Sequence, residues 1–191
     1  MARWLVLTIF LACISCREKS LQRPADSFSL DSMLDLQVNY LSKNGASLIK
    51  VSSINSNGFT SSLDSKHIDW ENELESFRAI SLVHKPVYAD SYDIKIMPDD
   101  KSNLFVKTWV ARDKQPIQSL KVYFLNPNQI KRLEATLEQT NFVFTSRKNL
   151  TLEFSILGAK TLPERYEISG YQKLFWEEAQ DYKLACEIRT K

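Results

Sequence analysis

Few side chains in this chain could support acid–base or metal chemistry. The sequence has two histidines, His67 and His84. Asp64, His67, Asp69 and Glu71 are close in sequence, and carboxylates with an imidazole can bind a divalent ion where a fold makes them converge. The same segment also has the composition of a polar loop that leads into a helix cap, and we favour that interpretation. We therefore predict no metal site and no cofactor.

The sequence shows no signature of a catalytic nucleophile. It has no His-Glu-x-x-His, no pair of Cys-x-x-Cys motifs, no Gly-x-Ser-x-Gly and no phosphate-loop pattern. Cys186 lies on the apolar side of an alternating segment, which predicts a buried, unreactive thiol. We expect a protein that is not an enzyme. A hydrolase or metal-dependent enzyme using His67 or His84 is the third of three hypotheses.

Composition narrows the class of protein. A chain of 191 residues with 43% apolar and 25% charged side chains can bury the core of one domain. Its formal net charge of +2 is far from the strongly basic character of most nucleic-acid-binding surfaces, so we expect no nucleic-acid partner. Disordered, collagen-like and coiled-coil classes are excluded by the same composition.

The N-terminus has the pattern of an export signal. Arg3 precedes an apolar run from Trp4 to Ile14, and Ser15 and Cys16 follow it. A membrane-spanning helix needs about 20 apolar residues, so this run is too short to remain in the bilayer as a permanent anchor. The pattern predicts that residues 1–15 are a signal peptide, cleaved after Ser15.

The leader resembles that of bacterial lipoproteins, in which a small residue precedes a cysteine that becomes acylated. Ser15-Cys16 carries the resemblance, although Cys13 stands where the family usually has Leu, and Ala12-Cys13 is the second-ranked site. The resemblance implies a diacylglyceryl thioether on Cys16, usually with a third acyl chain on its amine. Several chains on one residue hold a protein firmly on a membrane. Arg17 follows rather than Asp, which favours the outer membrane.

Two helices are expected in the mature chain. Residues 16–28 include Pro24 and lack periodicity, so they are predicted to be a lipidated N-terminus and flexible tether. Apolar residues recur every three or four positions from Ser29 to Ser42, which predicts a helix capped by Ser29 or Asp31. A second helix is predicted from Asp69 to Ser81, because Lys85-Pro86 forbids its continuation.

The remaining chain is predicted to form an antiparallel sheet. Asn57-Gly58 predicts the turn of a hairpin with strands at 46–54 and 59–63. Apolar and polar residues alternate from Tyr92 onward, as in strands with one buried and one solvated face. Residues 29–191 are therefore predicted to be a single α+β domain, a curved antiparallel meander of about 7–9 strands packed with two helices. Four prolines are placed between the alternating segments: Pro98, Pro116, Pro127 and Pro163.

Aromatic residues are spread over the predicted sheet, and core packing is the ordinary explanation for them. Phe105, Trp109, Phe175 and Trp176 put large apolar groups on both faces of their strands. They motivate an alternative in which the sheet and helices enclose a cavity for an acyl chain or a hydrophobic peptide. The layout from Lys121 to Phe154 is similar to that of periplasmic proteins that carry or accept lipoproteins. That similarity is topological and implies such a cavity.

Short patterns also resemble a set of small uncharacterised envelope lipoproteins. Asp69-Trp70 with Glu73-Leu74, then Lys85-Pro86, and Ile168-x-Gly170 later in the chain carry this resemblance. The leading hypothesis is a lipid-anchored cell-envelope protein that binds a partner and catalyses no reaction. A binder or carrier of a hydrophobic ligand is the second hypothesis.

Overall fold

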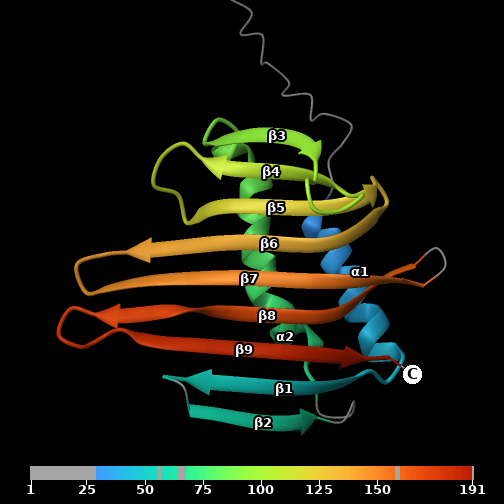
Figure 1. Cartoon of the computed structure of the whole chain (residues 1–191), viewed down its shortest axis with the longest axis horizontal. Helices are drawn as coiled ribbons and strands as arrows, with labels where there is room; N and C mark the ends of the chain where they lie inside the picture. The colour runs from blue at the N-terminus through green and yellow to red at the C-terminus, as the bar shows by residue number, and fades with distance from the viewer. Residues whose placement is uncertain (1–28, 56, 64–67, 158–159, 191) are drawn as a thin grey trace, which may run out of the picture.

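The structure, a computed structural model, describes residues 29–55, 57–63, 68–157 and 160–190. These residues form one open antiparallel sheet of nine strands, and two helices cover one of its faces (Figure 1). The predicted α+β class, with one sheet and two helices, is confirmed. The predicted signal peptide, acylation site and tether, residues 1–28, lie outside the described residues.

The first helix, α1 (Leu30–Lys43), lies within one residue of its predicted bounds. The hydroxyl of Ser29 accepts a hydrogen bond from the amide of Ser32, so Ser29 is the N-cap, as one of the two expected residues. Leu30, Leu34 and Leu41 are buried against the sheet. The helical spacing of these leucines explains why this segment packs as a helix.

The second helix, α2 (Trp70–Arg78), is shorter than predicted. Its N-cap is Asp69, as expected, but at Ala79 the chain tightens into a 3₁₀ helix, η2 (Ala79–His84), and then η3 (Pro86–Tyr88). Phe77, Ile80 and Val83 are buried at intervals of three residues, which matches the three residues per turn of a 3₁₀ helix. Among the described residues, no helix has the length and apolar composition needed to cross a bilayer.

The sheet is a meander of strands β3 to β9, and the N-terminal hairpin β1–β2 adds two strands beside β9. Its spatial order is β2-β1-β9-β8-β7-β6-β5-β4-β3, with every neighbouring pair antiparallel. The order places β1 beside β9, so residues from the two ends of the domain become neighbours. The strand bounds are β1 (Ser47–Ile54), β2 (Asn57–Leu63), β3 (Tyr92–Pro98), β4 (Phe105–Ala111), β5 (Ile117–Asn126), β6 (Gln129–Thr140), β7 (Phe144–Leu157), β8 (Lys160–Leu174) and β9 (Gln180–Arg189).

The first hairpin turns two residues earlier than predicted. Ile54 pairs with Asn57, so Asn57-Gly58 belongs to β2 and the turn starts at Asn55. Asn55 has φ 45°, a left-handed conformation that Asn tolerates. Its amide donates to the carbonyl of Asp181 at 3.0 Å, and its side-chain oxygen accepts from the Asp181 amide at 3.0 Å. This contact with β9 holds the turn in place.

Two prolines lie inside strands rather than between them. Pro163 is within β8, opposite Phe154, where the register between β7 and β8 shifts after Glu153. The shift leaves Glu164 without a partner on β7, so Pro163 is next to a bulge, where a proline within a strand is tolerated. Pro98 is the last residue of β3, and its partner Phe105 is the first residue of β4.

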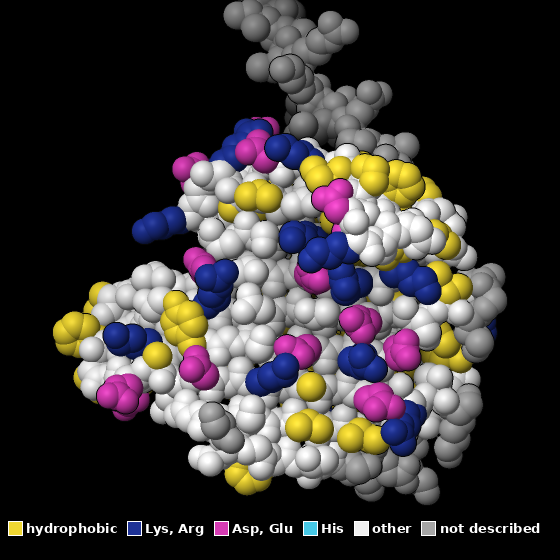
Figure 2. Space-filling view, viewed as in Figure 1, with side chains coloured by type: hydrophobic (Ala, Val, Ile, Leu, Met, Phe, Trp, Pro, Cys, Tyr) yellow, Lys and Arg dark blue, Asp and Glu magenta, His cyan; other side chains and the backbone are white. Residues whose placement is uncertain are grey.

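The two faces of the sheet differ in character. The helix-covered face carries most of the core, including Leu120, Leu152 and Tyr166. The opposite face carries pairs of opposite charge such as Arg165 with Glu153 and Lys183 with Glu167. Figure 2, which views this face, shows basic and acidic side chains interspersed over it. Exposed pairs of this kind contribute little stability and keep the face solvated.

Candidate functional site

Two hairpin tips meet at one end of the sheet. In the β6–β7 turn, the side-chain oxygen of Asn141 accepts hydrogen bonds from the amides of Val143 and Phe144, at 2.8 and 2.9 Å. In the β8–β9 turn, the amide of Phe175 donates to the carbonyl of Val143 at 2.9 Å. The second turn is closed by a bond from the Glu177 amide to the Leu174 carbonyl, at 3.2 Å. The bond between Phe175 and Val143 joins the two tips, and the other bonds fix the shape of each turn.

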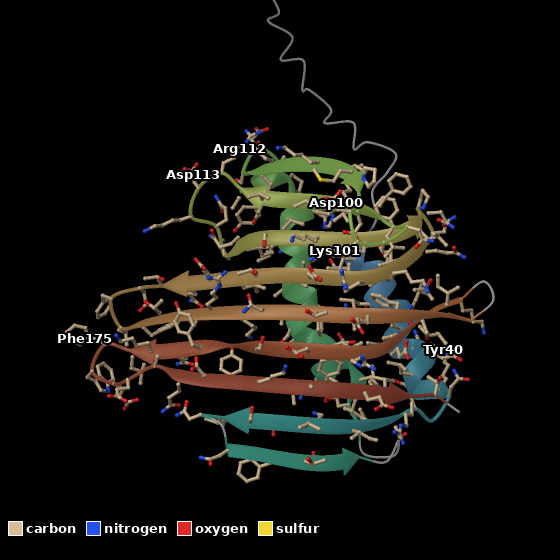
Figure 3. The ribbon with its side chains drawn as sticks, in the orientation of Figure 1. Tyr40, Asp100, Lys101, Arg112, Asp113 and Phe175 are labelled. Atoms are coloured by element: carbon tan, nitrogen blue, oxygen red, sulfur yellow. The ribbon has the colours of Figure 1, made fainter. Side chains whose placement is uncertain are left out.

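Three aromatic side chains project from these tips into solvent. Phe142 is 91% exposed, Phe175 82% and Trp176 65%. We call these three residues the aromatic tip. Figure 3 labels Phe175 at the projecting end of the sheet, and Figure 2 shows hydrophobic side chains at that end. Large apolar side chains gathered on one exposed site are typical of surfaces that bind something.

The β8–β9 side of the aromatic tip is acidic. The segment from residue 173 to residue 181 has one cationic side chain, Lys173. It has three carboxylates: Glu177, Glu178 and Asp181. All four side chains are exposed. The aromatic tip therefore combines apolar area with local negative charge, and a complementary surface would be apolar with a basic rim.

A partly buried polar network lies under α2, away from the aromatic tip. Strand pairing puts Lys50 opposite Cys186 and Cys186 opposite Tyr166. Glu73 of α2 accepts from the ammonium of Lys50 at 2.7 Å and from the hydroxyl of Tyr166. The lysine and glutamate side chains are about 25% and 12% exposed. This network fixes α2 on the sheet.

Cys186 lies inside that network and is buried, as predicted. Burial raises the pKa of its thiol to about 12, the nearby Glu73 carboxylate adds to the rise, and Lys50 opposes it. A thiol with so high a pKa carries almost no thiolate at neutral pH, so its nucleophilicity is low.

The four residues proposed to line a cavity do not come together. Trp109 is buried, with its ring 5.3 Å from the ring of His84. Phe105, on the same strand, is half-exposed and stacks on Phe124 at 6.0 Å. Phe175 and Trp176 belong to the aromatic tip. The strand register separates the two pairs, since Phe105 begins β4 at one end of the sheet and Phe175 follows β8 at the other.

Of the four residues considered as metal ligands, the two that the structure describes have other partners. Asp69 caps α2, and Glu71 pairs with Arg78 at 2.8 Å, while Asp64 and His67 lie outside the described residues. Over the parts of the chain that the structure describes, no three His, Cys, Asp or Glu side chains are placed to hold a metal ion. Desolvation in the core lowers the pKa of His84, the Lys107 ammonium lowers it further, and Asp31 opposes them.

Phe142 is a residue of the aromatic tip that the sequence analysis did not single out. A local signal exists: Phe142 follows Asn141 where the alternation of the flanking segments breaks, so it sits in a turn. Two adjacent aromatic residues, Phe175 and Trp176, are followed by two adjacent glutamates. Apolar and polar residues do not alternate here, so the segment does not match a strand with one buried face. The meeting of the two turns has no local signal, because it depends on the order of the strands.

Comparisons with models of protein families, with curated proteins and with solved structures gave no significant match to this chain.

Proposed function

We propose that this chain is a lipid-anchored protein of the cell envelope that binds a partner protein through the aromatic tip. The export-signal pattern in residues 1–15 and the acylation pattern at Ser15-Cys16 support the anchor, and Arg17 after that cysteine supports an outer-membrane location. The observation that carries the binding role is the exposure of Phe142, Phe175 and Trp176 on two hairpins that are bonded to each other.

The aromatic tip has the physical properties of an interface anchor. Burying one such side chain in a partner contributes about 2 kcal/mol, and aromatic residues dominate the energetics of many interfaces. The bonds from Asn141 and Phe175 fix both turns before binding. Little conformational entropy is then lost on association, which favours affinity.

The charges select a protein rather than an anionic membrane as the partner. Glu177 and Glu178 directly follow Trp176, and they would be repelled by a surface of anionic lipids. A protein pocket with an apolar floor and Lys or Arg at its rim would attract the same two carboxylates and accept the aromatic rings. We therefore assign to the partner an apolar pocket rimmed by basic residues.

Site-specific photocrosslinking in the cell envelope tests this function. A photoreactive amino acid is placed singly at Phe142, Phe175 or Trp176, and at Phe59 as the control. Phe59 is a 69% exposed aromatic on the edge strand β2. We expect one adduct of the same mass from the three tip positions and none from Phe59. Equal labelling at Phe59, or no protein adduct from the tip, would contradict the proposal.

Charge reversal gives the second arm of the test. Replacing both Glu177→Lys and Glu178→Lys should reduce the tip adduct at least tenfold, because the variant would repel a basic rim. Phe175→Ser and Trp176→Ser should reduce it as well. All these side chains are exposed, so the free energy of unfolding should change by less than about 0.5 kcal/mol in each variant. Lost crosslinking in a stable variant is then a loss of binding.

A further inference from the structure

The edge strand β3 exposes an apolar row beside its backbone edge. Among the described residues it pairs with β4 alone, and no described strand lies along its other side. Ile94 and Ile96 point to the same face of the sheet, and they are 52% and 56% exposed. Asp93 and Lys95 alternate with them on the opposite face. An edge with this pattern is a ready template for another strand.

Two hydrogen bonds establish which backbone groups face the open side. The amide of Asp99 donates to the carbonyl of Leu104 at 2.9 Å, and the amide of Arg112 donates to the carbonyl of Ser91 at 3.0 Å. In an antiparallel ladder, hydrogen-bonded residues alternate along the strand. Odd-numbered residues of β3 are therefore bonded to β4. Tyr92, Ile94 and Ile96 direct their amides and carbonyls outward.

We propose that a second copy of this chain pairs antiparallel with β3, so that the two copies form one continuous sheet. Ile94 lies opposite the partner's Ile94, and Asp93 lies opposite the partner's Lys95. Tyr92, Ile94 and Ile96 then exchange backbone hydrogen bonds with the residues they face, because all three direct those groups outward. Opposite charges and β-branched pairs in direct opposition stabilise antiparallel strands.

The sequence of β3 disfavours the neighbouring registers. Centring the pair on Lys95 would put two ammonium groups in direct opposition, and Pro98 would face Tyr92 without an amide to donate. Centring it on Ile96 would place Pro98 opposite Ile94. Only the register centred on Ile94 sets Asp93 against Lys95 twice. This self-complementarity identifies the occupant of the edge as a second copy of the chain.

The charge on Asp93 remains accessible to a partner strand. Its carboxylate pairs with Arg112 at 2.9 Å, and both side chains are more than half exposed. Figure 3 labels Arg112 at the β3 side of the sheet. An exposed pair of this kind is weak, so Asp93 can interact with a second cation at little cost.

Mass measurements on the detergent-extracted protein test the association. Native mass spectrometry should give a species of twice the single-chain mass. Ile94→Pro removes an amide that faces the second copy and leaves the hydrogen bonds between β3 and β4 intact. Lys95→Glu places a carboxylate opposite the Asp93 carboxylate of the second copy. Each variant should raise the dissociation constant of the dimer at least tenfold. Asp93→Lys with Lys95→Asp should restore the dimer. Lys173→Glu, the same charge change on β8, should leave it unchanged.

Disulfide trapping in intact membranes tests the register. Directly opposed Cα atoms in a hydrogen-bonded antiparallel pair are about 5.5 Å apart, which suits a disulfide. Ile94→Cys should therefore give an oxidised dimer, and Ile96→Cys should give none. A monomer at every concentration, a dimer that survives Ile94→Pro, a crosslink through Ile96→Cys, or capture of a different protein at β3 would overturn the inference. Strands β4 to β7 separate β3 from β8. The absence of a dimer would therefore not contradict partner binding at the aromatic tip, and the absence of partner binding would not contradict the dimer.

Discussion

The hydroxyl of Tyr166 on β8 donates a hydrogen bond to Oε1 of Glu73 on α2, and Lys50 on β1 donates to Oε2 of the same carboxylate. Glu73 thus receives one donor from each of two strands that are far apart in sequence. Both strands flank β9, so the carboxylate is held over the centre of a three-strand segment. The contact sets the position of α2, since the ring of Tyr166 also meets Phe77 of that helix edge-on.

Removing the hydroxyl should destabilise the protein. Tyr166→Phe keeps the packed ring but leaves Glu73 with one donor fewer, and a hydrogen bond to a charged group contributes about 1.5–3 kcal/mol. We expect the free energy of unfolding, measured by urea denaturation, to fall by about 2 kcal/mol. Glu75→Gln on the exposed side of α2 is the control and should change it by less than about 0.5 kcal/mol. If the free energy of unfolding of the Tyr166→Phe variant equalled that of the parent protein, the hydrogen bond from Tyr166 to Glu73 would not be stabilising.

Cys186 should resist alkylation while the protein is folded. Its pKa of about 12 compares with an ordinary value near 9, so the thiolate population at pH 8 is about 1,000-fold lower than in the unfolded chain. Iodoacetamide labelling of the Cys186 peptide, quantified by mass spectrometry, should be slow in buffer and fast in denaturant. The same shift makes the folded state less stable as the pH rises from about 9 towards 12, because only the unfolded chain then releases this proton. Rapid labelling of the native protein would contradict the buried placement.

His84 should make the protein less stable in mild acid. Its pKa is lowered by burial, so below the ordinary value of about 6.5 the unfolded chain binds a proton that the folded chain does not. The free energy of unfolding should therefore decline as the pH falls below about 6.5, and His84→Gln should flatten that decline. NMR titration of the His84 ring gives a direct check, and Lys107→Gln should move its midpoint upward. A midpoint at or above the ordinary value in the parent protein would be inconsistent with the core environment.

Gly170 and Gly58 form a matched pair for testing strand contacts. A Cβ at Gly170 would overlap the carbonyl oxygen of Arg147 on β7, whereas a Cβ at Gly58 would lie 3.8 Å from the carbonyl oxygen of Ser52, an ordinary contact. Gly170→Ala should lower the free energy of unfolding by about 2 kcal/mol or more, because two paired strands must move apart. Gly58→Ala should leave it unchanged or slightly raised. Thermal unfolding of the two variants side by side measures the difference, and equal stability would refute the close approach.

Features that depend on neighbouring residues were predictable from the sequence. Ser29 and Asp69 cap their helices because each precedes an apolar helical pattern, and the cap bond spans only three residues. The alternating segments after Tyr92 became strands for the same local reason. The 3₁₀ turn at Ile80 and Val83 departs from prediction, because the sheet surface decides which spacing is buried.

Features that depend on strand order were beyond local reasoning. The turn at Asn55 is held by Asp181, and Glu73 is held by Tyr166, contacts that exist only because β1 and β8 flank β9. The aromatic tip arises similarly, because β7 and β8 are neighbours and their turns meet through Phe175 and Val143. The residues themselves were visible in the sequence, but their juxtaposition was not.

The mass of the intact protein extracted from cell membranes tests the membrane anchor most directly. We predict a chain that starts at Cys16, lacks residues 1–15 and carries the added mass of a diacylglyceryl group, with or without an N-acyl chain. Replacing Cys16→Ala should abolish both the added mass and the membrane association. A protein that retains Met1, or a chain whose Cys16 is unmodified and found in the cytosol, would contradict the proposed anchor and the envelope function built on it.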